Sequence, residues 1–174
     1  IKIVVAGCDS ETLREQAYYE FLEKHNVSWK MLPKFYGNVE TNLGFGAVFD
    51  LIRDYDGEVS KTLEHYLSSA EETKFNSCGL SKAIPSLKCF LIQEKVITMT
   101  LKAKNIVYKR INYTEGILLI VDNIGNSDFI PICNYINFFA KKKILRKWQR
   151  FESTLLATYP HNKMLYRMLT SSHR

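Results

Sequence analysis

The sequence lacks the features that mark membrane, secreted and metal-binding proteins. No apolar run approaches the ~18 residues of a membrane span, and the first residues do not resemble a signal peptide. The four Cys and four His residues are scattered without the spacing of metal ligands. We therefore predict a cytoplasmic protein with free thiols and no membrane span, and disulfides are the less favoured alternative.

Repeats and low-complexity segments are also absent from the sequence. Its 174 residues are 46% hydrophobic and 24% charged, as in an ordinary globular protein. This length allows one or two small domains with a sizeable core. The formal net charge of +6 is compatible with an anionic partner but does not require one.

Two segments have the spacing of the catalytic loop and the metal-binding strand of protein kinases. A kinase reads H-R-D-L-x-x-x-N, followed by an apolar strand that ends in D-F-G. Leu101 and Asn105 stand where that pattern has Leu and Asn, and Asp122 ends an apolar strand before Gly125. Because carboxylate and amide oxygens suit Mg²⁺, we assign Asn105 and Asp122 to a metal site. The alternative for Asp122 is a residue that merely forms a turn.

Thr100 stands in the place of the catalytic Asp. A hydroxyl does not accept a proton near neutral pH as a carboxylate does, so Thr100 predicts weak or absent phosphoryl transfer. It could instead orient a water or a hydroxyl. Lys102, two residues later, either neutralises a γ-phosphate or is a solvated lysine. We keep both residues as catalytic candidates.

A lysine and a glutamate near the start of the chain complete the expected nucleotide site. Lys2 lies in a β-branched run that predicts a strand over 1–6, as does the phosphate-binding lysine of kinases. A helix is predicted over 9–25, and Glu15 lies at the edge of its apolar stripe, so Glu15 is the expected partner of Lys2. The alternative is that Lys2 and Glu15 form only a structural ion pair. The stripe consists of Leu13, Ala17, Tyr18, Phe21 and Leu22.

A β-hairpin is predicted next, with strands over 34–41 and 45–52. Gly44 and Gly46 are assigned to its turn, because a lone Gly-x-Gly is a weak sign of a phosphate loop. Asp50 and Ile52 end the second strand, before the expected hinge between two lobes, and we assign both to the nucleotide site.

The remaining elements are predicted to be mainly helical. A turn at 54–57 precedes helices over 60–70, with Ser60 as a cap, and over 80–95, with Pro85 in the first turn. Strands over 105–110 and 117–122 pair with each other. After Pro131 the chain is predicted to be helical to about Tyr159.

A longer series of motifs resembles one protein family. It includes a P-x-Y/F-x-G-x-V-E-T pattern and a D-N-I-G tetrapeptide, and its segments are Trp29–Lys30, Leu32–Gly44, Val48–Gly57, Ser60–Leu63, Val121–Gly125 and Phe129–Pro131. They resemble the bacterial YrbL family, named after a PhoP-regulated protein, over roughly residues 1–151. The resemblance implies a kinase-like fold. It also implies that Thr100 is typical of the family, whose members carry Ser or Thr at the position of the catalytic Asp.

Together these patterns predict an α+β protein with a kinase-like two-lobe fold. Residues 1–53 would form an N-terminal lobe of sheet and one helix, and residues 54–174 a small, mainly helical C-terminal lobe. The strands that carry the Gly-rich loop of a kinase are not recognisable before Lys2, so we expect an N-terminally truncated lobe. Only 52 residues follow Asp122, without a recognisable A-P-E motif, so we expect a reduced C-terminal lobe.

A basic segment over 141–150 contains six Lys and Arg residues. Phe138, Leu145, Trp148 and either Phe151 or Ile144 would form an apolar stripe on one side of a helix. The favoured interpretation is an amphipathic helix that packs on the core and leaves its basic face in water. The alternatives are binding to nucleic-acid phosphates or to anionic lipid. We do not expect nucleic acid as a partner, because no recognition motif accompanies the charge.

From these patterns we expect a pseudokinase-like regulator that binds ATP and Mg²⁺ through Lys2, Glu15, Asn105 and Asp122. A protein partner is also expected, although the sequence does not identify it. One alternative is an atypical phosphotransferase or nucleotidyltransferase. Another is a basic module for nucleic acid or protein in which the nucleotide pocket is vestigial.

Overall fold

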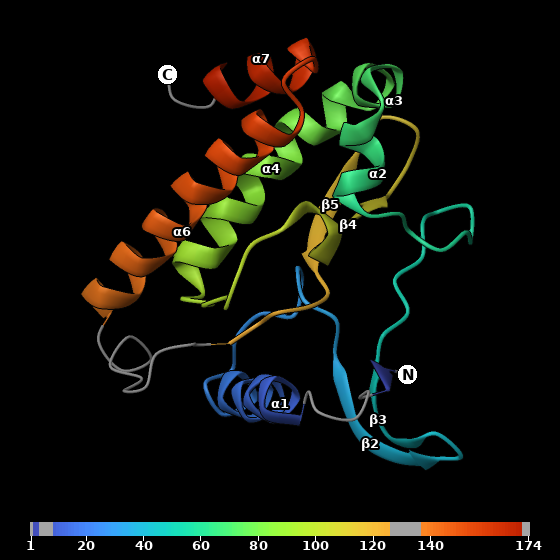
Figure 1. Cartoon of the computed structure of the whole chain (residues 1–174), viewed down its shortest axis with the longest axis vertical. Coiled ribbons are helices and arrows are strands. Elements are labelled where there is room, and N and C mark those ends of the chain that lie inside the picture. Colours follow the sequence, from blue (N-terminus) through green and yellow to red (C-terminus); the bar gives the residue numbers. More distant parts are fainter. Residues whose placement is uncertain (1, 4–8, 126–136, 172–174) are drawn as a thin grey trace.

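The computed structural model describes residues 2–3, 9–125 and 137–171 of the chain. Its elements form two groups (Figure 1). Among the described residues, one group contains helix α1 (Asp9–Lys24) and a three-stranded antiparallel sheet, and the other contains five α-helices beside a two-stranded hairpin. The predicted α+β class is thereby confirmed, whereas the kinase-like two-lobe interpretation stays a prediction.

The three-stranded sheet has the order β1-β3-β2, with β1 (Lys2–Ile3), β2 (Phe35–Thr41) and β3 (Gly44–Phe49). Residues 4–6 of the strand predicted over 1–6 lie outside the described residues. Lys2 pairs with Ala47 of the central strand, which fixes where the lysine leaves the sheet. Gly44 has φ +106° at the end of the β2–β3 turn, a conformation that glycine adopts readily. Gly46 lies within β3 and not in the turn.

Helix α1 buries only part of the predicted stripe. Glu15, Tyr18, Tyr19 and Leu22 are buried, but Leu13 is 64% exposed and Ala17 is also exposed. The reason is aromatic packing, because Tyr19 rests on the ring of Trp29 and on two phenylalanine rings of the sheet, Phe35 and Phe49. The placement of Glu15 on the buried side is confirmed.

The hairpin of β4 (Ile106–Arg110) and β5 (Gly116–Ile120) lies where the two groups of elements meet (Figure 1). The amide of Ile120 donates to the carbonyl of Met31 at 3.1 Å, and the amide of Tyr108 donates to the carbonyl of Lys61 at 2.9 Å. The hairpin therefore bonds on one side to the segment after α1 and on the other to the segment before the helices. Asp122 lies two residues beyond the end of β5.

The helices begin at different residues than predicted. The helix predicted over 60–70 is divided into α2 (Leu63–Ser68) and α3 (Ala70–Phe75), because Thr62 and Ser69 each cap a helix with a side-chain oxygen. Ser60 is no cap, since its hydroxyl donates to Asp54. Helix α4 (Ser77–Gln93) begins earlier than residue 80, so Pro85 lies inside the helix and not in its first turn.

Helix α6 (Asn137–Thr158) ends before Pro160, as predicted. Most of its basic side chains are exposed while its apolar side is buried, so the predicted amphipathic helix is confirmed. The stripe differs in two respects: Phe138 is 69% exposed, and Ile144 is buried. Lys143, counted with the basic face, is 5% exposed. Helix α7 (Lys163–Ser171) was not predicted; Asn162 begins it by accepting a hydrogen bond from the amide of Leu165.

One buried cluster joins the two groups of elements. It runs from Tyr18, Tyr19 and Leu22 of α1 through Ile106 and Ile120 of the hairpin to the apolar sides of α4, α6 and α7. Within the described part of the chain, no helix has both the length and the apolar character that crossing a bilayer requires. Cys78 and Cys89 are free thiols, as predicted, and Cys8 and Cys133 lie outside the described residues.

Candidate functional site

The structure brings Lys2 of β1 between two carboxylates. Its ammonium nitrogen lies 2.7 Å from Oε2 of Glu15, which confirms the pairing predicted from the helical spacing. The same nitrogen donates a second hydrogen bond to Oδ1 of Asp122, beyond the end of β5. Three residues that are far apart in the sequence therefore form one charged group, which we call the ion cluster.

Glu15 is the buried member of the ion cluster, with 3% of the residue exposed. Its second oxygen accepts a hydrogen bond from the amide of Ile124 at 3.3 Å, so both oxygens have partners. Burial raises the pKa of the Glu15 carboxyl above its ordinary value, although Lys2 opposes the rise. Partial burial would lower the pKa of Lys2, but the hydrogen bonds that its ammonium donates to Asp122 and Glu15 outweigh it and raise the pKa. Lys2 is therefore charged at neutral pH.

The turn after Asp122 positions the segment that precedes Thr100. Asn123 has φ 62°, which Asn tolerates better than most residues, and Gly125 has φ +139°. The carbonyl of Asn123 accepts a hydrogen bond from the amide of Met99 at 2.7 Å. The amide of Gly125 donates to the carbonyl of Ile97 at 2.9 Å. The D-N-I-G turn therefore lies beside residues 97–99, which lead into Thr100.

Asn105 lies next to Asp122 through the backbone. It ends a short 3-10 helix, η1 (Ala103–Asn105), and its carbonyl accepts a hydrogen bond from the amide of Val121 at 2.9 Å. The residue is only 6% exposed. Among the described residues, its Nδ2 is a buried side-chain nitrogen without a hydrogen-bond partner. Nδ2 is a hydrogen-bond donor, and a buried donor is costly to leave without an acceptor oxygen.

Thr100 and Lys102 are both exposed in the loop over residues 99–104, which precedes Asn105 in the sequence and begins beside the D-N-I-G turn. The loop is held from the other side by α6, because the ammonium of Lys147 donates to the carbonyl of Met99. No pattern in the sequence predicted this contact, since Lys147 was counted with the basic face. The hydroxyl of Thr100 is therefore accessible, but the backbone before it is fixed.

Asp50 and Ile52 lie beyond β3, which ends at Phe49 and not at residue 52 as predicted, and both are bonded to other segments than the ion cluster. The carboxylate of Asp50 accepts hydrogen bonds from the amide of Lys34 and from the hydroxyl of Tyr36, both at 2.8 Å. The carbonyl of Ile52 accepts from the amide of Ser60 at 3.0 Å. These bonds fasten the end of β3 to the start of β2 and to the next segment. Their assignment to the nucleotide site stays a prediction.

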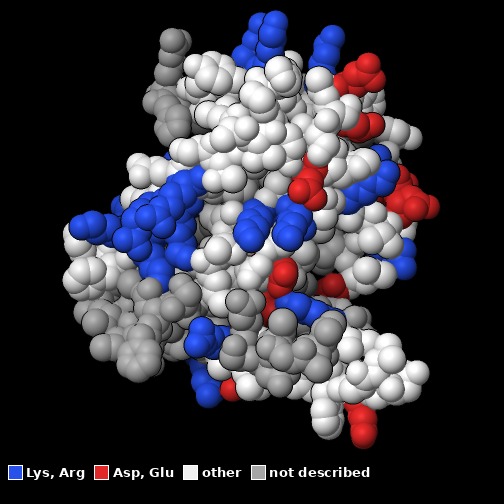
Figure 2. Space-filling model, viewed as in Figure 1, with Lys and Arg blue, Asp and Glu red and all other residues white. Residues whose placement is uncertain are grey.

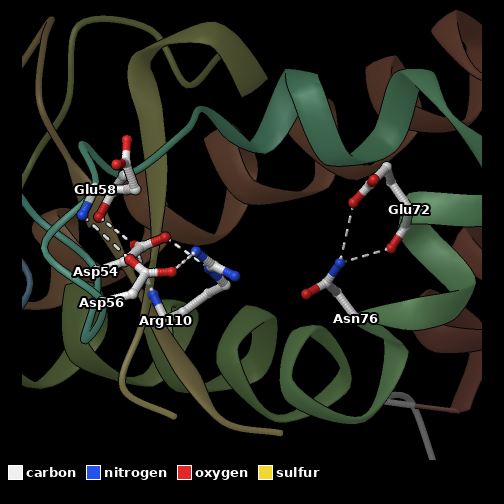
Figure 3. A network of polar contacts seen from close by, with 7 residues as sticks. Asp54, Asp56, Glu58, Glu72, Asn76 and Arg110 are labelled. Carbon is white, nitrogen blue, oxygen red and sulfur yellow. Dashed lines mark hydrogen bonds and ion pairs between the residues drawn. The ribbon is translucent and has the colours of Figure 1, made fainter. Parts of the chain in front are cut away.

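Arg110 anchors the turn at 54–57, which sequence reasoning missed. Its guanidinium donates to Asp54 and Asp56, each at 2.6 Å (Figure 3). Burial would raise the pKa of Asp54, but hydrogen bonds from Ser60 and Arg110 outweigh it and hold the pKa below its ordinary value. The acids and the arginine are more than fifty residues apart, so no local pattern could have predicted the contact. The connection between the two groups of elements is thereby tied to β4.

The donor set fits a weakly held Mg²⁺ better than a transition metal. Within the described residues, no three His, Cys, Asp or Glu side chains lie close enough together to hold a metal ion. Asn105 and Asp122 provide only an amide and a carboxylate. Mg²⁺ characteristically takes few protein ligands and completes its shell with phosphate and water oxygens.

Comparison with known proteins identifies the family of the chain. The profile of the family described as PhoP regulatory network protein YrbL matches residues 1–156. The chain is 36% identical over 147 residues to the YrbL protein of Escherichia coli (strain K12), and the matched region covers 83% of this chain and 69% of the relative. The YrbL protein of Shigella flexneri matches with the same values. With its family profile and its relatives in agreement, the chain belongs to the YrbL family.

Proposed function

We propose that the chain binds Mg-ATP at the ion cluster and acts as a pseudokinase-like regulator. The observation that carries this proposal is the position of Lys2, which contacts a buried glutamate from α1 and the aspartate that follows β5. In a kinase, the strand lysine pairs with a helix glutamate, and the D-F-G aspartate holds the metal. The ion cluster contains the same three residue types from the same three kinds of element.

The ion cluster is suited to exchange partners with a nucleotide. Lys2 and Asp122 are each partly exposed, with side-chain exposures of 38% and 39%, whereas the Glu15 side chain is 4% exposed. A phosphate could take the place of Asp122 beside Lys2, while Asp122 turns to a cation. Glu15 would keep Lys2 in position during this exchange, because its second oxygen is held by Ile124.

Asn105 and Asp122 are the residues that would hold Mg²⁺. The ligand atom of Asn105 would be its side-chain oxygen, and the backbone bond from Val121 to Asn105, which brings the residue next to Asp122, supports this assignment. Mg²⁺ would neutralise phosphate charge there. Lys102, which is exposed on the same loop as Thr100, would add a further positive charge.

Thr100 makes regulation a better proposal than efficient catalysis. A positioned general base typically contributes about 10²–10⁴ in rate. Thr100 provides a hydroxyl in an exposed loop and no carboxylate. The chain would therefore retain nucleotide while transferring its γ-phosphate slowly.

Titration with a fluorescent ATP analogue, with and without Mg²⁺, tests the proposal. We expect Mg²⁺-dependent binding that weakens at least ten-fold in Lys2→Met, because the lysine provides the charge that faces the phosphates. Lys24→Met, which removes an exposed lysine at the end of α1, is the matched control and should bind as the parent does. Equal binding by both variants, or no binding at all, would contradict the proposal.

A further inference from the structure

The helical layer formed by α4, α6 and α7 has a strong excess of positive charge. These three helices pack against one another. They contain ten of the 24 Lys and Arg residues of the chain but only one of its 18 Asp and Glu residues. The remainder of the chain is therefore net negative. The net positive charge of the protein therefore comes from this one layer.

Helix α6 presents most of this charge to solvent. Lys141, Lys142, Arg146 and Arg150 are exposed, and Figure 2 shows a dense group of basic side chains over α6. Lys142, Arg146 and Arg150, which we call the basic row, are spaced at i, i+4 and i+8. They therefore lie on one face, with a rise of about 6 Å between neighbours.

The basic row is not neutralised within the described part of the protein. None of its residues forms an ion pair with a described residue. Glu152, the single acid of the layer, accepts a hydrogen bond from the indole nitrogen of Trp148 at 2.6 Å. Like charges spaced at i, i+4 destabilise a helix. An external anion would remove this repulsion.

Two exposed aromatic rings adjoin the basic row. Phe138 and Phe139, in the first turn of α6, are 69% and 46% exposed, and their ring centroids are 5.8 Å apart. Rings of this kind beside lysines suit the boundary between headgroups and acyl chains, where apolar bodies are buried and charges remain in contact with phosphate. A nucleic-acid duplex offers no comparable place for them, because stacking requires unpaired bases.

We propose that the face formed by Phe138, Phe139, Lys141 and the basic row docks on a lipid surface that contains anionic phospholipid. The contact is peripheral, since the apolar side of α6 (Ala140, Ile144, Trp148, Phe151 and Leu155) is already buried in the core. The basic side chains contact headgroup phosphates, and the two rings enter the interface. This inference does not depend on the nucleotide site.

The test is sedimentation with vesicles of phosphatidylcholine, with and without phosphatidylglycerol. We expect binding only to the vesicles that contain phosphatidylglycerol, and binding that decreases as salt is added. Each basic residue near an anionic surface contributes roughly a five-fold factor, so the variant Lys142→Gln/Arg146→Gln/Arg150→Gln should bind roughly a hundred-fold more weakly. The matched control Lys24→Gln/Lys30→Gln/Lys61→Gln removes equal charge at exposed positions outside the layer and should lose far less.

A second variant tests the aromatic rings at constant charge. Phe138→Ser/Phe139→Ser should reduce vesicle binding several-fold and leave the salt dependence unchanged, because no charge is removed. Circular dichroism checks that each variant is folded. Equal loss in the two charge variants, binding to pure phosphatidylcholine, or tighter binding to a short DNA duplex than to the anionic vesicles would overturn the proposal.

Discussion

At the scale of single residues, Asp122 and Thr100 have opposite consequences for the proposed site. Asp122 stands beside Lys2, where a kinase-like site requires a carboxylate. Thr100 stands where such a site requires a base. The sequence indicated both positions, because the motif is local and its spacing is short. The unsatisfied amide of Asn105 and the contact of Lys147 with Met99 depend on segments that meet only in the fold.

Substitution of Thr100 tests whether the site lacks only its base. Thr100→Asp should raise ATP turnover at least ten-fold, because it returns a carboxylate five residues before Asn105. Thr100→Asn is the control. Asparagine has the shape of aspartate without its charge, so this variant should leave turnover unchanged. The measurement is phosphate release under Mg-ATP. Fast γ-phosphate transfer by the parent chain would contradict the pseudokinase proposal and favour the atypical phosphotransferase.

Asp54 provides a prediction for stability and pH. Its pKa in the folded state lies below its ordinary value of 3.8, so its contribution is present above that pH and is lost as the pH falls further. Asp54→Asn should cost about 2 kcal/mol at neutral pH, since Asp54 is buried and bonds to Arg110. In urea unfolding at a series of pH values, the difference from the parent should shrink below pH 3.8. A difference that is constant or grows toward low pH would show that the Arg110 contact does not depend on the carboxylate charge.

At the scale of elements, predictions succeeded where the pattern was local. The β2–β3 hairpin, the β4–β5 hairpin and the end of α6 before Pro160 follow from short alternating runs and from a breaker residue. The buried face of α1 was predicted only in part, since aromatic contacts with Trp29 and the sheet determine it. The start of α4 was placed too late, because Pro85 was taken as a first-turn residue, yet the helix continues through it.

Gly79 of α4 gives a test of how the helix packs on the hairpin. A Cβ at Gly79 would lie 1.9 Å from the hydroxyl oxygen of Tyr108, a residue that is 2% exposed and has little room to move. Gly79→Ala should therefore destabilise the protein by about 1–3 kcal/mol, although alanine is the better helix former.

Removing the Tyr108 hydroxyl should remove most of this effect. In a Tyr108→Phe background, the carbonyl oxygen of Thr114 at 3.0 Å and the nearest ring atom at 3.2 Å would still be tight neighbours of the new Cβ, so Gly79→Ala should cost no more than about 1 kcal/mol. Thermal unfolding of the four proteins gives the coupling energy directly. Simple additivity of the two substitutions would show that the packing differs from that described.

At the scale of the whole molecule, one core and two charged regions organise the chain. The core is continuous from α1 to α7, so the site is built where separate segments converge on it. The ion cluster lies where these segments converge, and the excess of basic residues lies on the helical layer of α4, α6 and α7. Composition predicted a positive net charge and the run at 141–150 but not the near absence of acids from three packed helices, because α4 and α7 are separated from α6 in the sequence.

The thermal stability of the protein under millimolar Mg-ATP tests the central claim most directly. A ligand that binds only the folded state adds RT ln(1 + [L]/Kd), about 1.4 kcal/mol at ten times its Kd. The parent chain should show a higher melting temperature with Mg-ATP than with Mg²⁺ alone. Asp122→Asn should lose most of this increase, and the control Glu20→Gln, an exposed residue on α1, should keep it. If Mg-ATP raises the melting temperatures of the parent and of Asp122→Asn equally, or raises neither, the ion cluster is not a nucleotide site.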